Sequence, residues 1–187
     1  STGINVVNIG CVVSPLKFFA RKHLKINGGA MITASHNPKE FNGLKMAEGD
    51  GCIYGKEIQE IRKIAEKSDF FAAKEKGKEK KLDVLPAYIK LLTEKIKLKK
   101  KLRVVLDCGN GTASLSTPKV LRGLGIELTE LYCDSDGTFP NHHPDPTQVD
   151  AMQELIAKVK ETKADAGIGI DGDGDRIGVV DDKGNLI

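Results

Sequence analysis

The chain has 187 residues, of which 40% are apolar and 29% charged, so it is long enough to form one large or two small domains with a hydrophobic core. This composition excludes fibrous and intrinsically disordered proteins. The net charge is only +3, and the lysine-rich stretches 74–83 and 95–103 contain no aromatic side chains that could stack on bases. We therefore expect no nucleic-acid partner.

Cysteine spacing and hydropathy indicate the cellular location in which we expect the protein. The sequence contains four widely spaced cysteines and no CxxC pair: Cys11, Cys52, Cys108 and Cys133. This spacing favours neither a zinc finger nor a disulfide framework, and it indicates a reducing, cytoplasmic location. No stretch approaches the roughly 20 apolar residues of a membrane span, and the N-terminus has no signal-peptide pattern. We expect no membrane partner, and the sequence favours no particular oligomeric state.

The first half of the chain predicts alternating strands and helices. Residues 4–13 predict a buried strand, residues 15–24 a helix begun by Pro15 after a Ser14 cap, and residues 28–33 a second strand. Strand, helix and strand within about thirty residues predict a parallel βαβ unit, which binds ligands at the carboxyl ends of its strands. Residues 55–70 predict an amphipathic helix packed on a sheet through Ile58, Ile61 and Ile64.

A charged stretch then leads into a second alternating segment. Helices are predicted at 84–97, 117–125 and 150–163, and strands at 102–108, 126–133 and on both sides of an acidic loop within 164–182. The predicted fold class is α/β, with mixed, largely parallel sheets flanked by helices in two consecutive βαβ-type domains. We place these domains at residues 1–76 and 77–187.

The acidic loop has the sequence DGDGDR, residues 171–176. Asp171, Asp173 and Asp175 repel one another unless a cation neutralises them, and the glycines between them let the backbone fold so that all three point inward. Oxygen ligands favour Mg²⁺, Mn²⁺ or Ca²⁺ over zinc. An EF-hand is rejected because Arg176 stands where that loop requires glycine, and an exposed hairpin turn explains one Asp-Gly but not three. Arg176 beside a divalent cation points to a phosphoryl group.

A second polar feature is MITASHNPKEFNGLK, residues 31–45. Pro38 keeps Asn37 out of helical geometry, so the segment must turn and present Ser35 at a fixed angle. A serine hydroxyl needs a base or a metal to become a good nucleophile, and His36 and Lys45 are the nearby candidates. An acyl-transfer serine would need a G-x-S-x-G elbow, which this segment lacks.

Taken together, TASHNP, NGLK and GIDGDGDR occur in an order that resembles the α-D-phosphohexomutases, the phosphoglucomutase and phosphomannomutase family. LRVVLDCGNGTAS and DGTFPNHHPDPT resemble further segments of the same family. The resemblance spans nearly the whole chain. It implies a phosphosugar mutase whose members are normally four-domain chains, with this chain covering part of domain 1 and most or all of domain 2.

The resemblance also implies roles for individual residues. Ser35 would be the phosphoserine, and with Asp171, Asp173 and Asp175 it would hold Mg²⁺. Asn37, Lys45 and Arg176 would bind the substrate, a hexose phosphate. Lys45 and His36 would also assist proton transfer, with Lys45 as general base. Phosphate would move between C1 and C6 of the hexose through a bisphosphorylated sugar, with glucose or mannose 1,6-bisphosphate as activator.

The sequence also departs from the family pattern. The N-terminal part of domain 1, the loop that reads the sugar hydroxyls and the cluster that clamps the second phosphate have no counterpart here. GCVVSP replaces the Thr-Pro of many members, so Ser14 would take the threonine's place. We therefore expect an inactive fragment whose exposed surfaces permit non-native association. We also expect the adjacent His142 and His143 to be structural.

Two other functions stay open at the level of sequence. A magnesium-dependent phosphatase could use the same acidic loop with water as acceptor. A nucleotide-binding α/β module could use DCGNGTAS, although Ser114 replaces the third glycine of G-x-G-x-x-G, with Glu127 or Glu130 at the distance of a ribose-binding acid.

Overall fold

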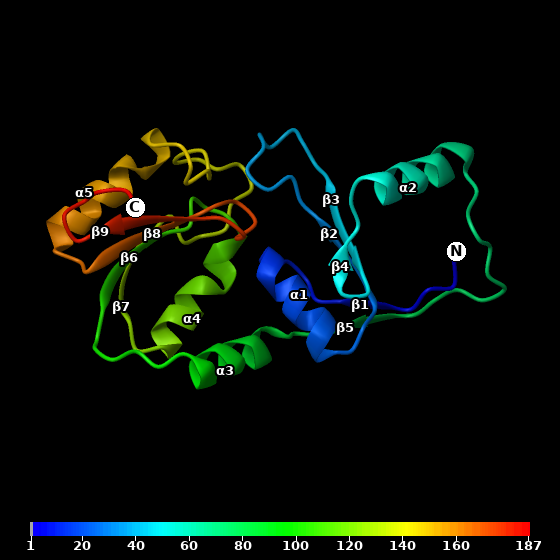
Figure 1. Ribbon diagram of the computed structural model, residues 1–187, viewed down its shortest axis with the longest axis horizontal. Coiled ribbons are helices and arrows are strands. Elements are labelled where there is room, and N and C mark those ends of the chain that lie inside the picture. Colours follow the sequence, from blue (N-terminus) through cyan, green and yellow to red (C-terminus); the bar gives the residue numbers. More distant parts are fainter. Residues whose placement is uncertain (1) are drawn as a thin grey trace.

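The structure is a computed structural model and describes residues 2–187. Figure 1 shows the first half of the chain, blue to cyan, beside the second half, green to red. The described part of the chain contains parallel and antiparallel sheets flanked by helices, which confirms the predicted α/β class. Within the described residues no helix is both long enough and apolar enough to cross a membrane.

The first half contains two small sheets. Strand β1 (Val6–Asn8) pairs in parallel with β5 (Glu79–Lys81), and β2 (Gly28–Ile32), β3 (Leu44–Glu48) and β4 (Gly51–Cys52) form an antiparallel sheet in that order. The predicted parallel βαβ unit is therefore wrong, because β1 and β2 belong to different sheets. Strand β5 lies within the lysine-rich stretch 74–83, for which the sequence predicted no strand, and its side chains are exposed.

Helix α1 (Ser14–His23) connects β1 to β2. Pro15 lies in the first turn as expected, because its missing N–H costs nothing there. The predicted Ser14 cap is absent, and the Ser14 hydroxyl donates instead to a carboxylate of the second half, Asp173. The beginning of α1 therefore helps to hold the two halves together.

Helix α2 (Lys56–Lys67) forms where its isoleucine spacing predicted it, but it does not pack on a sheet. No residue of α2 is buried, and Ile58 and Ile64 are 39% and 45% exposed. Figure 1 shows α2 at the end of the molecule far from α5 (Gln153–Thr162). The expected packing is wrong because no sheet face among the described residues covers this helix.

The second half is one four-stranded sheet with the order β7-β6-β8-β9. Strands β6 (Arg103–Asp107), β7 (Glu127–Leu131) and β8 (Ala166–Ile170) are parallel, and β9 (Ile177–Asp181) returns antiparallel to β8. This half also contains three helices, α3 (Leu85–Lys95), α4 (Thr117–Gly123) and α5. Two short 3-10 turns accompany them, η1 (Thr112–Leu115) and η2 (Asp150–Met152). The predicted elements of this half are confirmed.

The alternation of glycine and isoleucine in β8 lets α5 lie directly on the sheet. A Cβ at Gly167 would stand 2.7 Å from Val159, and one at Gly169 would stand 2.7 Å from Met152. Leu155 and Val159 are fully buried as a result, and burying a side chain of this size stabilises the fold by about 1.5–3 kcal/mol. This packing fixes the strand that leads into the acidic loop.

Candidate metal and phosphoryl site

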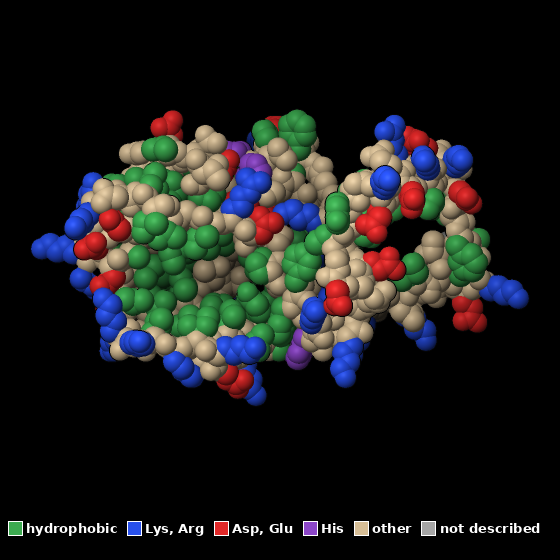
Figure 2. Space-filling model, viewed as in Figure 1, with side chains coloured by type: hydrophobic (Ala, Val, Ile, Leu, Met, Phe, Trp, Pro, Cys, Tyr) green, Lys and Arg blue, Asp and Glu red, His purple; other side chains and the backbone are tan. Residues whose placement is uncertain are grey.

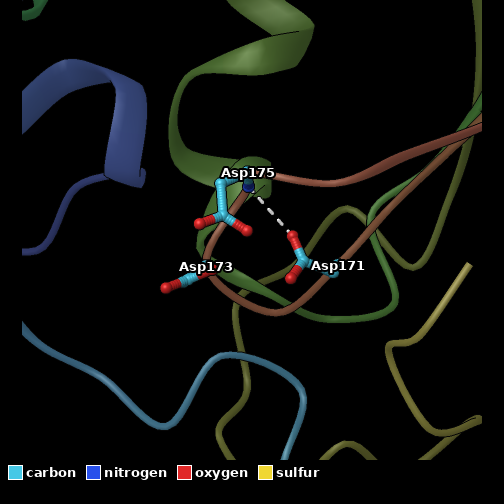
Figure 3. A group of neighbouring side chains, drawn as sticks. All are labelled: Asp171, Asp173 and Asp175. Atoms are coloured by element: carbon cyan, nitrogen blue, oxygen red, sulfur yellow. Dashed lines mark hydrogen bonds between the residues drawn. The ribbon is translucent and has the colours of Figure 1, made fainter. Parts of the chain in front are cut away.

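The acidic loop joins β8 to β9, and its three aspartates converge as predicted. Asp171 and Asp173 are 0% and 2% exposed, and the three residues each offer a carboxylate oxygen within 4.8 Å of the others. Figure 3 shows the side chains together at the turn. Asp171 shapes the loop, because its Oδ1 accepts hydrogen bonds from the backbone N–H groups of Asp175 at 2.9 Å and Arg176 at 3.0 Å.

Ser35 meets this loop from the other half of the chain. Its Oγ lies 2.9 Å from Asp171 Oδ2 and 3.1 Å from Asp173 Oδ1, across 136 and 138 residues of sequence. The Ser35 backbone is left-handed, with φ of 59°, a conformation that an L-residue keeps only when its surroundings enforce it. The turn predicted from Pro38 therefore places Ser35 against two of the predicted metal ligands.

The hydroxyl groups of Thr33 and Ser14 link the Ser35 turn and the start of α1 to Asp173. Thr33 Oγ1 accepts the Ser35 backbone N–H at 2.8 Å and donates to Asp173 Oδ2 at 3.0 Å. Ser14 Oγ lies 3.1 Å from the same oxygen, and the Ser14 backbone N–H donates to the Asp173 carbonyl at 2.8 Å. Thr33 lies within the TASHNP motif, but the sequence alone gave it no role.

Lys45, on β3, places its ammonium group beside two of the aspartates. Its Nζ lies 2.6 Å from Asp173 Oδ2 and 2.6 Å from Asp175 Oδ2. Burial lowers the pKa of Lys45, but the hydrogen bonds and charges of both aspartates outweigh it, and the net pKa is raised. Burial raises the pKa of Asp173, but the hydrogen bonds from Lys45, Thr33 and Ser35 together with the Lys45 charge outweigh burial, and the net pKa is lowered. Both groups are therefore charged.

His36 connects Ser35 to Arg176. Its Nδ1 lies 3.3 Å from Ser35 Oγ, and its Nε2 lies 3.2 Å from Arg176 Nη1. A guanidinium only donates, so this contact is a hydrogen bond when Nε2 accepts, which places the ring proton on Nδ1, facing Ser35. In this arrangement His36 donates to the serine oxygen and does not remove its proton. Asn37 is exposed, and its side chain bonds the Ala34 carbonyl at 3.0 Å.

The donor set fits a hard divalent cation. Three carboxylates and a serine oxygen offer only oxygen ligands, and two of the carboxylates are buried. Among the described residues, the salt bridges to these carboxylates come from Lys45 alone, so one ammonium group faces the three carboxylates at contact distance. Mg²⁺ prefers oxygen ligands and commonly shares its coordination shell with a phosphoryl group. Figure 2 shows charged and histidine side chains gathered where the two halves meet.

The histidine pair after β7 has a structural position, as expected. The His142 side chain is 19% exposed, and its Nε2 lies 3.1 Å from Asp107, which is 2% exposed. The hydrogen bond to Asp107 raises the pKa of His142, against the opposing effect of burial. His143 is exposed, so the two rings point into different surroundings.

Two family models match the chain in succession. Domain I of phosphoglucomutase/phosphomannomutase matches residues 1–72, and domain II matches residues 86–184. The chain belongs to the phosphoglucomutase/phosphomannomutase family. The predicted resemblance is thereby confirmed, whereas the proposed domain boundary between residues 76 and 77 stays a prediction.

Curated members of this family are similar over the whole chain. A phosphoglucomutase of Neisseria meningitidis serogroup B is 45% identical over 186 residues, and a phosphomannomutase/phosphoglucomutase of Pseudomonas aeruginosa is 41% identical over 185. A solved structure of a family protein from Burkholderia thailandensis superimposes with a TM-score of 0.93 at 37% identity, covering 100% of this chain and 42% of that one. The present chain spans 40% of the length of the curated relatives.

Proposed function

We propose that this chain carries the phosphoryl-transfer half of a phosphohexomutase that moves phosphate between the C1 and C6 oxygens of a hexose phosphate. Ser35 is the residue that carries the phosphoryl group, and Asp171, Asp173 and Asp175 are the metal ligands together with an oxygen of that group. The contact of Ser35 Oγ with Asp171 and Asp173 supports this proposal most directly, because it brings an otherwise unremarkable hydroxyl to the predicted cation site.

In the transfer step, the phosphorus–oxygen bond to Ser35 breaks while a bond forms to a hydroxyl oxygen of the sugar. The sugar hydroxyl gives its proton to a base, and the serine oxygen keeps the electron pair of the broken bond. The reverse transfer from the other phosphate of the bisphosphorylated sugar restores Ser35. A bound Mg²⁺ supplies charge stabilisation to the transferring phosphoryl oxygens.

The surrounding side chains have separate roles. The Nδ1 of His36 lies 3.3 Å from the Ser35 oxygen and Arg176 contacts the other nitrogen of the same ring, so both would bind phosphoryl oxygens. Asn37 would contact the substrate beside them. Lys45 is the proposed general base, although its raised pKa keeps it protonated while it pairs with Asp173 and Asp175. It can accept a proton only when those carboxylates are neutralised by another cation, so metal binding and base function are coupled.

The isolated 187 residues should turn over hexose phosphates at a negligible rate. They span 40% of the length of curated relatives, and phosphoryl transfer depends on groups that position the sugar and its second phosphate. The proposal includes a cytoplasmic location and glucose or mannose 1,6-bisphosphate as the activator that loads Ser35.

Intact-mass measurement with peptide mapping tests the proposal. The chain is measured as purified and after incubation with Mg²⁺ and glucose 1,6-bisphosphate, beside Ser35→Ala and the control Ser68→Ala. One phosphoryl group on Ser35 in the wild type and in Ser68→Ala, but not in Ser35→Ala, is the expected result. If neither this chain nor a longer chain containing it acquires phosphate at Ser35, the proposal fails.

A metal-dependent phosphatase is the second candidate, because the same loop could direct water at a phosphoryl group. It predicts release of inorganic phosphate from simple phosphate esters and rapid loss of phosphate from Ser35. A phosphoserine that persists in water argues against it. A nucleotide-binding module would be favoured by thermal stabilisation with NAD and none with Mg²⁺.

A further inference from the structure

Two cysteines far apart in the sequence meet at the edge of the four-stranded sheet. The sulfur atoms of Cys108 and Cys133 lie 3.3 Å apart, across 25 residues of sequence. Strands β6 and β7 are parallel neighbours with Asp107 opposite Leu131, so the chain leaves the sheet at Cys108 and Cys133 on adjacent paths. The spacing of cysteines along the sequence gave no sign of this contact.

The backbone at this edge is suited to a bond between the two sulfurs. The Cys108 N–H donates to the Leu131 carbonyl at 3.2 Å, which continues the β6–β7 pairing past the last ladder residues. With Asp107 opposite Leu131, Cys133 lies one residue beyond the position opposite Cys108, so the two sulfurs meet on a diagonal between the neighbouring chains. The sulfurs need to approach by only about 1.2 Å to reach a bonded distance of about 2.05 Å.

The two thiols differ in exposure. Cys108 is 0% exposed, whereas Cys133 is partly exposed. The hydrogen bond from Cys133, together with burial, raises the pKa of the Cys108 thiol, so Cys108 keeps its proton. Of the two residues only Cys133 has surface in contact with solvent, so we expect an oxidant to reach Cys133 first, with Cys108 in place to react second.

We propose that Cys133 and Cys108 form a peroxide-reactive pair, in which Cys133 is the oxidised residue and Cys108 the resolving residue. The Cys133 thiol gives up its proton and its sulfur attacks one oxygen of hydrogen peroxide. The O–O bond breaks, the hydroxide that leaves takes up this proton as water, and Cys133 becomes a sulfenic acid. The Cys108 sulfur then attacks the Cys133 sulfur, an S–S bond forms, and the hydroxyl group leaves with the Cys108 proton as water. Two thiols and one peroxide give one disulfide and two waters.

The turn after Cys108 links this pair to the acidic loop. The Gly111 N–H donates to the Cys108 carbonyl at 2.7 Å, and Thr112 bonds the Gly172 carbonyl through its N–H at 2.9 Å and its hydroxyl at 3.1 Å. Movement of Cys108 toward Cys133 is therefore transmitted to the residue between Asp171 and Asp173. This consequence rests on the proposed metal site, whereas formation of the disulfide does not.

The chemistry is tested on the full 187-residue chain in a Cys11→Ser/Cys52→Ser background, which removes the two exposed thiols. After brief treatment with equimolar hydrogen peroxide, we expect the intact mass to fall by two hydrogens, non-reducing peptide maps to join the peptides of residues 108 and 133, and dithiothreitol to reverse both changes. In the same background, Cys108→Ser should accumulate a dimedone-reactive sulfenic acid at Cys133, and Cys133→Ser should leave Cys108 unmodified.

Peroxide treatment that leaves both thiols free in the folded background protein, as judged by circular dichroism, overturns the proposal. So does oxidation of Cys108 in Cys133→Ser at the rate of the parent. For the link to the acidic loop, titration with Mn²⁺ should give an affinity at least about threefold different between the oxidised and reduced forms. An unchanged affinity refutes the link, and absence of Mn²⁺ binding in both forms counts instead against the proposed metal site.

Discussion

The backbone carbonyl of Ser35 lies against the α-carbon of Gly172. A Cβ at position 172 would stand 2.3 Å from that oxygen, closer than unbonded atoms can approach. Gly172 also accepts hydrogen bonds from Thr112, so the acidic loop is held between the serine loop and the turn after β6. The glycines of DGDGDR therefore allow close approach of the two halves as well as convergence of the carboxylates.

Gly172→Ala should separate the serine loop from the acidic loop. We expect a loss of about 1–3 kcal/mol in the free energy of unfolding, typical of forcing an extra methyl group into a packed site. Phosphate loading of Ser35 should fall with it. Urea unfolding and intact mass measure the two effects, with Gly137→Ala as control, because a Cβ there meets no atom within 4 Å. Equal behaviour of both variants would contradict the close packing at Gly172.

Thr33→Val should weaken the link between the phosphoserine turn and Asp173. Valine matches threonine in shape but can neither accept the Ser35 N–H nor donate to Asp173. We expect a cost of about 1–2 kcal/mol in stability and slower loading of Ser35, whereas Thr33→Ser keeps the hydroxyl and most of the wild-type behaviour. Loading rates by mass spectrometry separate the two variants. A Thr33→Val chain that loads as fast as the wild type would show that the hydroxyl is dispensable.

The sequence predicted those parts of the site that are encoded locally. The three aspartates fall within five residues, and repulsion among them together with the intervening glycines indicated their convergence. Pro38 two residues beyond His36 indicated a turn at Ser35. In both cases the signal and the structure it predicts lie within one short segment, so no distant partner was needed to interpret it.

Long-range pairings were not predictable in the same way. Strand β1 pairs with β5, where Asn8 bonds Glu79 across 71 residues, and β5 is a lysine-rich, exposed segment without the alternation of a strand. Thr33, Cys133 and His142 likewise acquire their partners only when separate segments meet. Their residue types are common in any sequence, and only the fold distinguishes them from surface residues.

Lys45→Met should bind divalent cations more tightly than the wild type. The Lys45 ammonium contacts Asp173 and Asp175 at 2.6 Å, so a cation that binds these carboxylates must displace it. We expect Mn²⁺ affinity to rise about tenfold, equivalent to about 1.4 kcal/mol, with lower thermal stability in the absence of metal. Calorimetric titration measures the affinity, and the exposed Lys39→Met is the matched control. Weaker Mn²⁺ binding in Lys45→Met would mean that Lys45 supports the metal site and does not compete for it.

The ion pair between His142 and Asp107 should make stability depend on pH. The two ring nitrogens of His142 face acceptors, the Asp107 carboxylate and the His143 carbonyl, so the doubly protonated ring donates a hydrogen bond to each. The nearby negative charge of Glu154 also favours the protonated ring. The pKa of His142 is raised above its unfolded value of about 6.5. The stabilisation is therefore complete below that value and is lost as the pH rises through the raised pKa.

His142→Gln should consequently lower the melting temperature more at pH 6 than at pH 9. A difference of about 1 kcal/mol between the two conditions corresponds to about 2–4 °C for a chain of this size. The exposed His143→Gln is the control and should show no such dependence. Thermal melts of the three proteins at both pH values decide the matter, because a deficit in His142→Gln that is equal at pH 6 and pH 9 would mean that the neutral ring packs as well as the charged one. The loop after β7 would then be held by shape and not by charge.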